Sequence, residues 1–212
     1  MEKNTNKNTE EHILNVAQEV FLKKGLDGAR MQEIADEAGI NKSLLHYYFR
    51  TKQKLFEKVF KVAFKHFFPK VQANLNSEKP LFEKIETFVE TYYSLLQKNP
   101  YIPAFVIHEL NRSATNVTEL FKSVFQDYDL KVDQMFGELD RQIQEEAAKG
   151  ILIPIESRQL IVNILSLCIF PFVAKPIIKG ILLENEEKKY KDFIEERKKT
   201  VSQFIIKAIS IA

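Results

Sequence analysis

Hydrophobic positions repeat along this chain with helical spacing almost throughout. Near the start, Ile13, Ala17 and Phe21 recur every four residues, so they share one side of a helix expected over about residues 9–24. Gly25 then ends the pattern, as glycine commonly does just past a helix C-terminus. Only six glycines and seven prolines interrupt the 212 residues, and alternating β-branched stretches are few. The sequence therefore predicts an all-α protein.

Two short helices separated by a tight turn are predicted between Met31 and Lys54. Ile34 and Ala38 lie on one side of the first helix, and Gly39 breaks the pattern. Asn41 can cap the second helix by accepting hydrogen bonds from the free amides of its first turn. This arrangement is typical of a helix-turn-helix, whose second helix enters the major groove of DNA.

Longer amphipathic segments make up the remainder of the chain. We expect helices over residues 51–68 (stopped by Pro69), 81–98, a short stretch after Pro100, one long segment through 120–143 that ends near Gly150, 160–176, and 186–211. The segment over 160–176 is apolar nearly all round, which predicts that other elements enclose it on most sides. The last segment is amphipathic, so these two helices form a plausible self-associating face.

The predicted domain organisation is a helix-turn-helix domain over residues 1–50, a connecting helix over 51–68, and a larger helical domain over 69–212 that dimerises. Candidate dimerisation residues lie on the last two helices: Leu160, Ile164, Leu167, Phe193, Val201, Phe204 and Ile205.

Positive charge is concentrated beside the predicted motif. The whole chain has a net charge of only +2, but residues 41–70 contain eight Lys or Arg and a single acid, Glu57. Neutralising DNA phosphates releases counterions and supplies most non-specific affinity. The local charge therefore favours a polyanion as the partner.

Catalytic and metal-binding signatures are absent from the sequence. The single cysteine, Cys168, lies in the most apolar segment, and the four histidines are scattered without an HExxH or CxxC spacing or a glycine-rich phosphate loop. We expect no enzyme activity, no metal and no cofactor. A polar start without a signal peptide, and no apolar run long enough to span a membrane, predict a cytoplasmic protein.

The first 60 or so residues resemble the TetR family of bacterial transcriptional regulators. Agreement occurs at several spacings together: Ala17 and Phe21 before Gly25, Ile34-Ala35, Ala38-Gly39, Leu45, Tyr48-Phe49, Lys52 and Leu55. The remainder, from Phe67 to Ala212, matches this family only in length and helical pattern. The resemblance implies DNA binding by the first part of the chain and dimerisation and ligand binding by the rest.

By this resemblance the helix over residues 42–48 reads DNA. The implied contacts are base edges and nearby phosphates for Lys42, Ser43 and Leu44, the DNA backbone for Tyr47 and Tyr48, and a phosphate for Lys52, which Arg30 could also reach by charge. Asn41 and His46 are the remaining candidate DNA-binding residues. Two positions depart from the family pattern, because His46 stands where tyrosine is usual and Arg30 where a threonine often caps the first motif helix. Either Tyr47 or Tyr48 could face DNA, because one of two consecutive tyrosines on a helix usually turns inward.

Aromatic residues in the larger domain admit two interpretations. Any single ring is by default a core residue, but the resemblance implies an apolar pocket with a few polar anchors. Candidate lining residues are Phe88, Tyr92, Tyr101, Phe105, His108, Glu109, Phe121, Phe125 and Tyr128. His108 could equally be a satisfied buried histidine, and Glu109 a solvated carboxylate.

Together these features predict a homodimeric repressor that a small apolar or aromatic ligand releases from a palindromic operator. Two other interpretations stay open at this point. One is a small-molecule binding or carrier protein whose helix-turn-helix is only structural, and the other is an activator without an effector.

Overall fold

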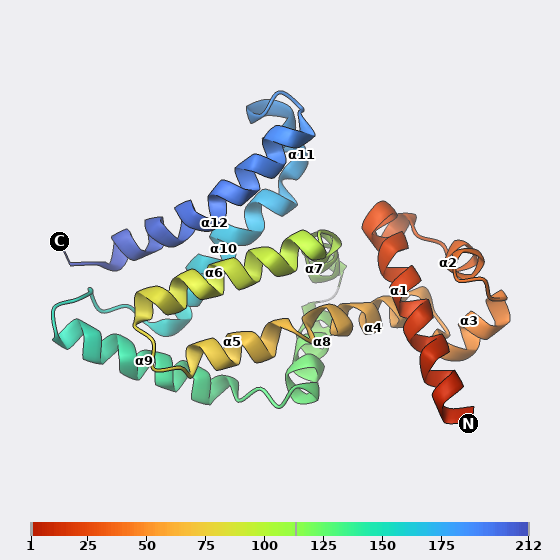
Figure 1. Cartoon of the computed structure of the whole chain (residues 1–212), viewed down its shortest axis with the longest axis horizontal. Coiled ribbons are helices and arrows are strands. Elements are labelled where there is room, and N and C mark those ends of the chain that lie inside the picture. Colours follow the sequence, from red (N-terminus) through yellow and green to blue (C-terminus); the bar gives the residue numbers. More distant parts are fainter. Residues whose placement is uncertain (1, 113, 212) are drawn as a thin grey trace. The chain divides into compact units, whose positions relative to one another are not determined.

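The chain folds into helices joined by short connections, as Figure 1 shows for this computed structural model. The structure describes the backbone of residues 2–112 and 114–211, and the side chains of residues 8–108, 110–111 and 114–211. The predicted all-α class is confirmed, since the only β-type pairing among these residues is an isolated bridge between Leu152 and Ser210. The helices are α1 Glu2–Gly28, α2 Met31–Glu37, α3 Lys42–Phe49, α4 Lys52–Phe64, α5 Phe67–Leu75, α6 Leu81–Lys98, α7 Tyr101–Arg112, α8 Ala114–Asp127, α9 Val132–Ala148, α10 Ser157–Val173, α11 Lys175–Ile177, the π-helical turn η1 Ile178–Leu182, and α12 Glu187–Ile209.

The helices fall into two compact units. The first unit contains α1 to α4, α7 and most of α8, and the second contains α5, α6 and α9 to α12. Sequence order therefore does not follow the division, because α7 and α8 join the helices that open the chain.

In the first unit, α1, α2 and α3 share a small apolar core. Ile13, Phe21, Ile34 and Leu45 are fully buried there, as the helical periodicity predicts. Gly25 has a φ of +69° and is the one non-helical residue within α1. α1 therefore consists of two helical segments joined by a kink at Gly25, where the first segment ends as predicted. The first segment begins before the expected residue 9, and the second continues to Gly28, so that only Ala29 and Arg30 of the turn expected over 26–30 are non-helical.

The connecting helix expected over residues 51–68 is interrupted. α4 ends at Phe64, and α5 begins at Phe67 with Pro69 in its first turn. A proline ring collides with the carbonyl four residues earlier, which here is the carbonyl of Lys65, and its nitrogen cannot donate a hydrogen bond to it. Pro69 therefore breaks the helix upstream of itself instead of ending it.

Aromatic side chains attach α7 and α8 to α4 within the first unit. The ring centroids of Phe56 and Phe105 are 4.0 Å apart, and those of Phe60 and Phe121 are 5.5 Å apart. Such close ring pairs add to the stabilisation gained from burial. We call Phe56, Phe60, Phe64, Tyr101, Phe105 and Phe121 the α4 ring cluster.

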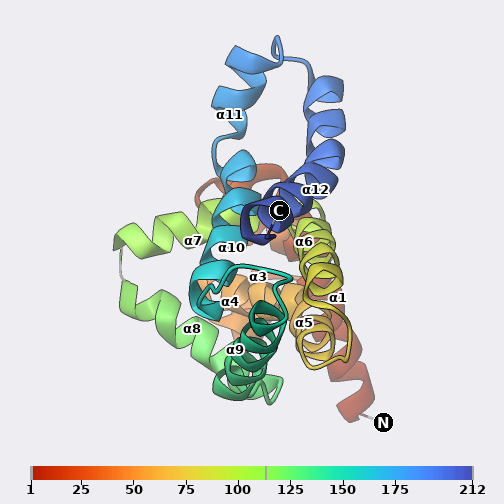
Figure 2. The same ribbon diagram turned by 90° about the vertical axis from the view of Figure 1, so that its left-hand side faces the viewer.

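In the second unit α6 is the central helix, packed against α5, α10 and α12, while α9 packs against α5 and α10. Figure 2 shows α10 and α12 as neighbours, with α11 at the end of the pair that lies away from the C-terminus. The single amphipathic segment expected through 120–143 is divided, because Asp129 takes a left-handed φ of 48° between α8 and α9. α9 ends at Ala148, close to Gly150 as predicted, and Gly150 takes a left-handed φ of +71°.

α10 is less enclosed than its composition predicts. One side of this helix leaves Val162, Phe170 and Val173 exposed, although Leu160, Ile164 and Cys168 on the other side are buried. Considered singly, none of the described helices has the length and apolar character to cross a membrane; α10 combined with residues 175–182, bent by 60°, meets that criterion by length and composition.

Candidate nucleic-acid interface

The turn before α3 is fixed by two residues. Gly39 has a φ of +64°, a left-handed conformation that glycine adopts without a steric penalty. Asn41 then caps α3, because its side-chain oxygen accepts a hydrogen bond of 2.7 Å from the amide of Leu44. The predicted cap is confirmed, and it sets where α3 begins.

α3 presents a polar face to solvent and an apolar face to the core. Leu45 and Phe49 are buried, whereas Lys42, Ser43 and His46 are exposed. Leu44 is half-buried at the edge of the exposed face. The helix therefore offers its N-terminal residues to a ligand in solution, which is the end that enters the groove in helix-turn-helix proteins.

The two consecutive tyrosines differ in exposure. Tyr47 is 73% exposed, while Tyr48 is half-buried. Their rings meet edge to face with centroids 5.5 Å apart, and the Tyr48 ring also lies 6.1 Å from that of Phe49. Tyr47 is thus the better placed of the two to contact a bound molecule.

His46 closes the C-terminal end of α3. Its Nδ1 lies 2.8 Å from the carbonyl oxygen of Arg50, which can only accept, so Nδ1 carries the hydrogen in this contact. Arg50 itself has a φ of 50°, an uncommon conformation outside glycine, and follows the last helical residue. The histidine at this unusual position therefore has a structural partner.

Arg30 lies at the N-cap of α2, where its side chain makes no capping hydrogen bond and is exposed. The residue before it, Ala29, is bonded to Lys52, whose ammonium donates a hydrogen bond of 3.0 Å to the carbonyl of Ala29. The same ammonium also donates to the carbonyl of Asp27 at 3.3 Å. Lys52 thus joins the start of α4 to the connection between α1 and α2.

Thr51 is a helix cap that was not predicted from the sequence. Its hydroxyl oxygen accepts a hydrogen bond of 3.1 Å from the amide of Lys54 and so caps α4. A threonine two residues after a helix end is a recognisable start signal. The cap fixes the first turn of α4, which carries Lys52.

The candidate ligand-lining rings are distributed over both units. Tyr101, Phe105 and Phe121 belong to the α4 ring cluster of the first unit. In the second unit, Phe88 and Tyr92 lie together with ring centroids 6.3 Å apart, and Phe125 contacts Phe68 at 5.2 Å. Tyr128 is also in the second unit and is half-buried.

Of the two candidate polar anchors, the structure describes the side chain of His108. The side chain of His108 is about half exposed, with its Nδ1 3.9 Å from a carboxylate oxygen of Asp27. The side chain of Glu109 lies outside the described residues. Among the residues that are described, no group of three His, Cys, Asp or Glu side chains is placed to hold a metal ion.

The candidate dimerisation residues separate by burial. Leu160, Ile164, Val201 and Ile205 are buried within the second unit, and Leu167 and Phe193 are half-buried. Phe204 on α12 is 65% exposed, and Val162 and Phe170 on the adjacent helix α10 are 56% and 61% exposed.

Sequence comparison finds relatives for the first part of the chain. Residues 13–59 match the model for bacterial regulatory proteins of the tetR family. The HTH-type transcriptional repressor NicS of Pseudomonas putida is 31% identical over 88 residues, which is 40% of this chain and 42% of that protein. The fatty acid metabolism regulator protein of Bacillus subtilis is 22% identical over 149 residues, 70% of this chain and 75% of that protein.

Solved structures extend the similarity to nearly the whole chain. The hemolysin II transcriptional regulator HlyIIR superposes with a TM-score of 0.59 at 24% identity, over 96% of this chain and 98% of that one. The TetR family regulator PfmR of Thermus thermophilus gives a TM-score of 0.61 at 14% identity, over 90% and 97% of the two chains. At these identities the likeness establishes the fold alone.

The sequence matches to the first two curated relatives, by contrast, span less than half of those proteins, at 42% and 49% of their lengths. The proteins named here are transcriptional regulators and not enzymes, in agreement with the expected lack of catalysis. Residues 13–59 thus match the family model for bacterial regulatory proteins of the tetR family, and the described chain shares its fold with the solved structures of HlyIIR and PfmR.

Proposed function

We propose that this chain is a transcriptional regulator that recognises a DNA sequence through α3. The observation that carries this proposal is the exposed N-terminal end of α3, where Lys42 and Ser43 face solvent on a helix that Asn41 caps and Leu45 and Phe49 anchor. A rigid support of this kind holds the exposed side chains in a fixed geometry, which sequence recognition requires.

The proposed contacts divide into two classes. Lys42, Ser43 and Leu44 at the start of α3 contact base edges, and so carry sequence preference. Tyr47, Lys52 and Arg30 contact the DNA backbone, and so set affinity and register. The second class is supported by the exposure of Tyr47 and by the position of Lys52 in the capped first turn of α4.

We propose further that two copies associate through α10 and α12. Support comes from the large apolar side chains that two adjacent helices expose, Val162 and Phe170 on α10 and Phe204 on α12, because exposed apolar groups of this kind commonly mark protein–protein contacts. A twofold dimer would present two copies of α3 to successive major grooves, about 34 to 36 Å apart, on a palindromic site.

The proposed mode of action is repression relieved by a small apolar or aromatic ligand. NicS is named as a repressor, which favours this mode over activation. The α4 ring cluster supplies a route: a ligand that displaces α7 or α8 moves Phe105 or Phe121 and hence α4, whose first turn Lys52 ties to the α1–α2 connection. A difference of ~1 to 3 kcal/mol in ligand affinity between two states gives a 5- to 150-fold change in DNA affinity.

A carrier protein with a purely structural motif is the alternative from another class. A second alternative is an activator that acts without an effector. The packing of the Phe56 and Phe105 rings is compatible with this alternative, because such rings also form an ordinary core that binds no ligand. DNA binding separates the regulator from the carrier, and the effect of ligands on that binding separates the two regulators.

The experiment is selection from a pool of random duplex DNA by the purified chain, followed by sequencing of the bound fraction. The regulator predicts enrichment of one site with twofold symmetry. A bound fraction with the same sequence distribution as the starting pool overturns the proposal. Repeating the selection in the presence of small apolar and aromatic compounds tests whether such a ligand releases the protein from its site.

A further inference from the structure

The second unit contains a polar pocket apart from the candidate aromatic positions. It has a volume of about 740 Å³ and lies where the α5–α6 connection faces α9. This volume falls within the usual range of ~300 to 1,000 Å³ for small-molecule sites. Its walls carry both charged and apolar groups, and Lys84 is the charged residue buried most deeply in it.

Lys84 occupies an unusual position on α6. It lies between Leu81, Ile85 and Phe88 on the side of the helix that faces the core, and only 5% of the residue is exposed. Its ammonium donates to the carbonyl oxygen of Leu75 at 2.8 Å and to the side-chain oxygen of Gln142 at 2.6 Å. Both acceptors are neutral, and an ammonium has three N–H donors.

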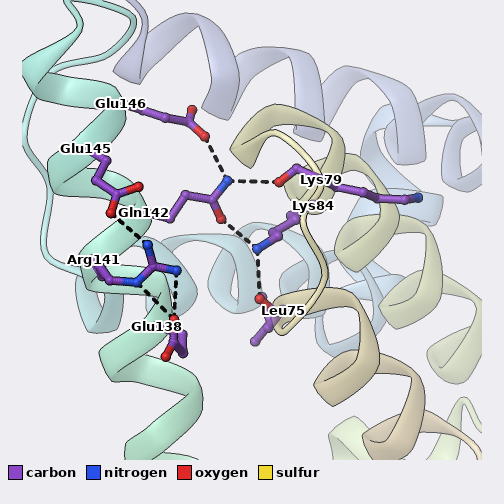
Figure 3. Close-up of polar contacts among 8 residues, drawn as sticks. All are labelled: Leu75, Lys79, Lys84, Glu138, Arg141, Gln142, Glu145 and Glu146. Carbon is purple, nitrogen blue, oxygen red and sulfur yellow. Dashed lines mark hydrogen bonds and ion pairs between the residues drawn. The ribbon is translucent and has the colours of Figure 1, made fainter.

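Three of the four carboxylates around the pocket, those of Glu138, Glu145 and Glu146, are bonded to other groups, as Figure 3 shows, while Glu78 acts on Lys84 only through its charge. Arg141 pairs with Glu138 at 2.9 Å and with Glu145 at 2.7 Å. Glu146 accepts from the Gln142 amide at 2.7 Å and from the backbone amide of Leu81 at 3.1 Å. Among the described residues, no carboxylate oxygen forms an ion pair with Lys84 within 4.0 Å.

A buried ammonium without an anionic partner is costly, because neutral carbonyls replace only part of the lost hydration. An anion in the pocket would supply the missing charge. The four glutamates that line the pocket, Glu78, Glu138, Glu145 and Glu146, disfavour a ligand with several negative charges. Phe82, Pro80 and Ile151 on the walls offer apolar surface to a small organic group.

We propose that this pocket binds a small monocarboxylic acid, with the carboxylate paired to the ammonium of Lys84 and the organic part against Phe82, Pro80 and Ile151. The site belongs to the second unit alone and does not depend on the DNA-binding function, so either proposal can fail without the other. Burial lowers the pKa of Lys84 in the free protein, and a bound carboxylate would raise this pKa.

The test uses the full-length protein with ¹³C-labelled lysine, titrated with butyrate and followed by NMR at the Lys84 Cε resonance. A saturable shift of that resonance, together with a higher Lys84 pKa at saturating butyrate, supports the site. The absence of a saturable shift overturns it. Inorganic phosphate is the second probe, and saturation by phosphate without a response to butyrate overturns the assignment to an organic acid.

Two variants test the role of Lys84 by calorimetry. Lys84→Met should weaken butyrate binding by about tenfold or more, since the charge partner is lost. Lys79→Met removes a lysine side chain from the same pocket, while its backbone carbonyl still accepts from Gln142 at 2.9 Å. This control should bind within about twofold of the unaltered protein. Equal losses of butyrate affinity in both variants, or no loss in either, would contradict the proposal. If Lys84→Met does not fold, the NMR titration of the wild-type protein decides between the outcomes.

Discussion

At the scale of single residues, Lys52 shows how one side chain can serve the fold and a ligand together. Two of its three N–H donors are directed at the carbonyls of Asp27 and Ala29. The charge itself is not cancelled by these neutral groups, so it remains able to attract a phosphate at the start of α4.

We predict that Lys52→Ala lowers affinity for every DNA sequence by a similar factor and reduces the slope of log affinity against log salt by about one unit. Fluorescence anisotropy with labelled duplexes at several salt concentrations measures both quantities. Lys191→Ala removes an exposed positive charge from α12 and should leave the salt slope unchanged. A loss confined to one DNA sequence would instead assign Lys52 to base recognition.

Cys168 illustrates a residue whose chemistry is suppressed by its surroundings. The residue is fully buried in α10, and burial raises the pKa of its thiol to about 12. We predict that the native protein at pH 8 does not react with Ellman's reagent, while the denatured protein releases one equivalent per chain. Rapid stoichiometric reaction without denaturant would show that α10 opens readily.

At the scale of elements, the cap at Asn41 defines the start of α3. We predict that Asn41→Ala destabilises the protein by ~1 kcal/mol, since the amide of Leu44 loses its side-chain acceptor. Asn41→Asp keeps an acceptor at this position and should retain most of the stability. Chemical denaturation measures the free energy of unfolding in both variants, and equal stability of all three proteins would show that the cap contributes nothing.

Element boundaries could be predicted where a local residue enforces them. Gly39 and Asn41 mark the turn before α3 because both act on neighbouring backbone groups. The prediction that Pro69 ends the connecting helix was wrong. Its ring excludes the helical position of the Lys65 carbonyl, so α4 ends before it, and Pro69 itself lies in the first turn of α5. The left-handed turn at Asp129 contains no glycine or proline that would indicate a helix break, so the division between α8 and α9 could not be predicted from the local sequence.

At the scale of the whole molecule, helical periodicity predicts which residues are buried but not what they are buried against. Leu160 and Val201 satisfy both a core and a dimer interpretation in the sequence, and both are buried within one chain. Exposure at α3 was easier to predict, because the family pattern fixes which side of that helix faces the core. The Lys84 pocket was missed, although a lysine three residues after Leu81 and four before Phe88 breaks an otherwise apolar stripe.

The proposed dimer depends on the exposed face of α10 and α12. We predict that the protein has twice the 24.7 kDa mass of one chain in solution and that Phe204→Glu shifts it toward the monomer, because a carboxylate would be buried in the interface. Tyr47→Glu places the same charge at an exposed aromatic position on α3 and should leave the mass unchanged. Light scattering after size exclusion measures these masses, and a monomeric wild-type protein at micromolar concentration would contradict the dimer.

The central claim is that α3 recognises the DNA sequence, and the most direct test compares the sites selected by the wild-type chain and by Lys42→Ala and Ser43→Ala. We predict that each variant still enriches a symmetric site but changes its base preference at one pair of symmetry-related positions, since we propose that these side chains contact base edges. Selection of an unchanged site by both variants, with affinity also unchanged, would show that α3 does not read the DNA sequence through these residues.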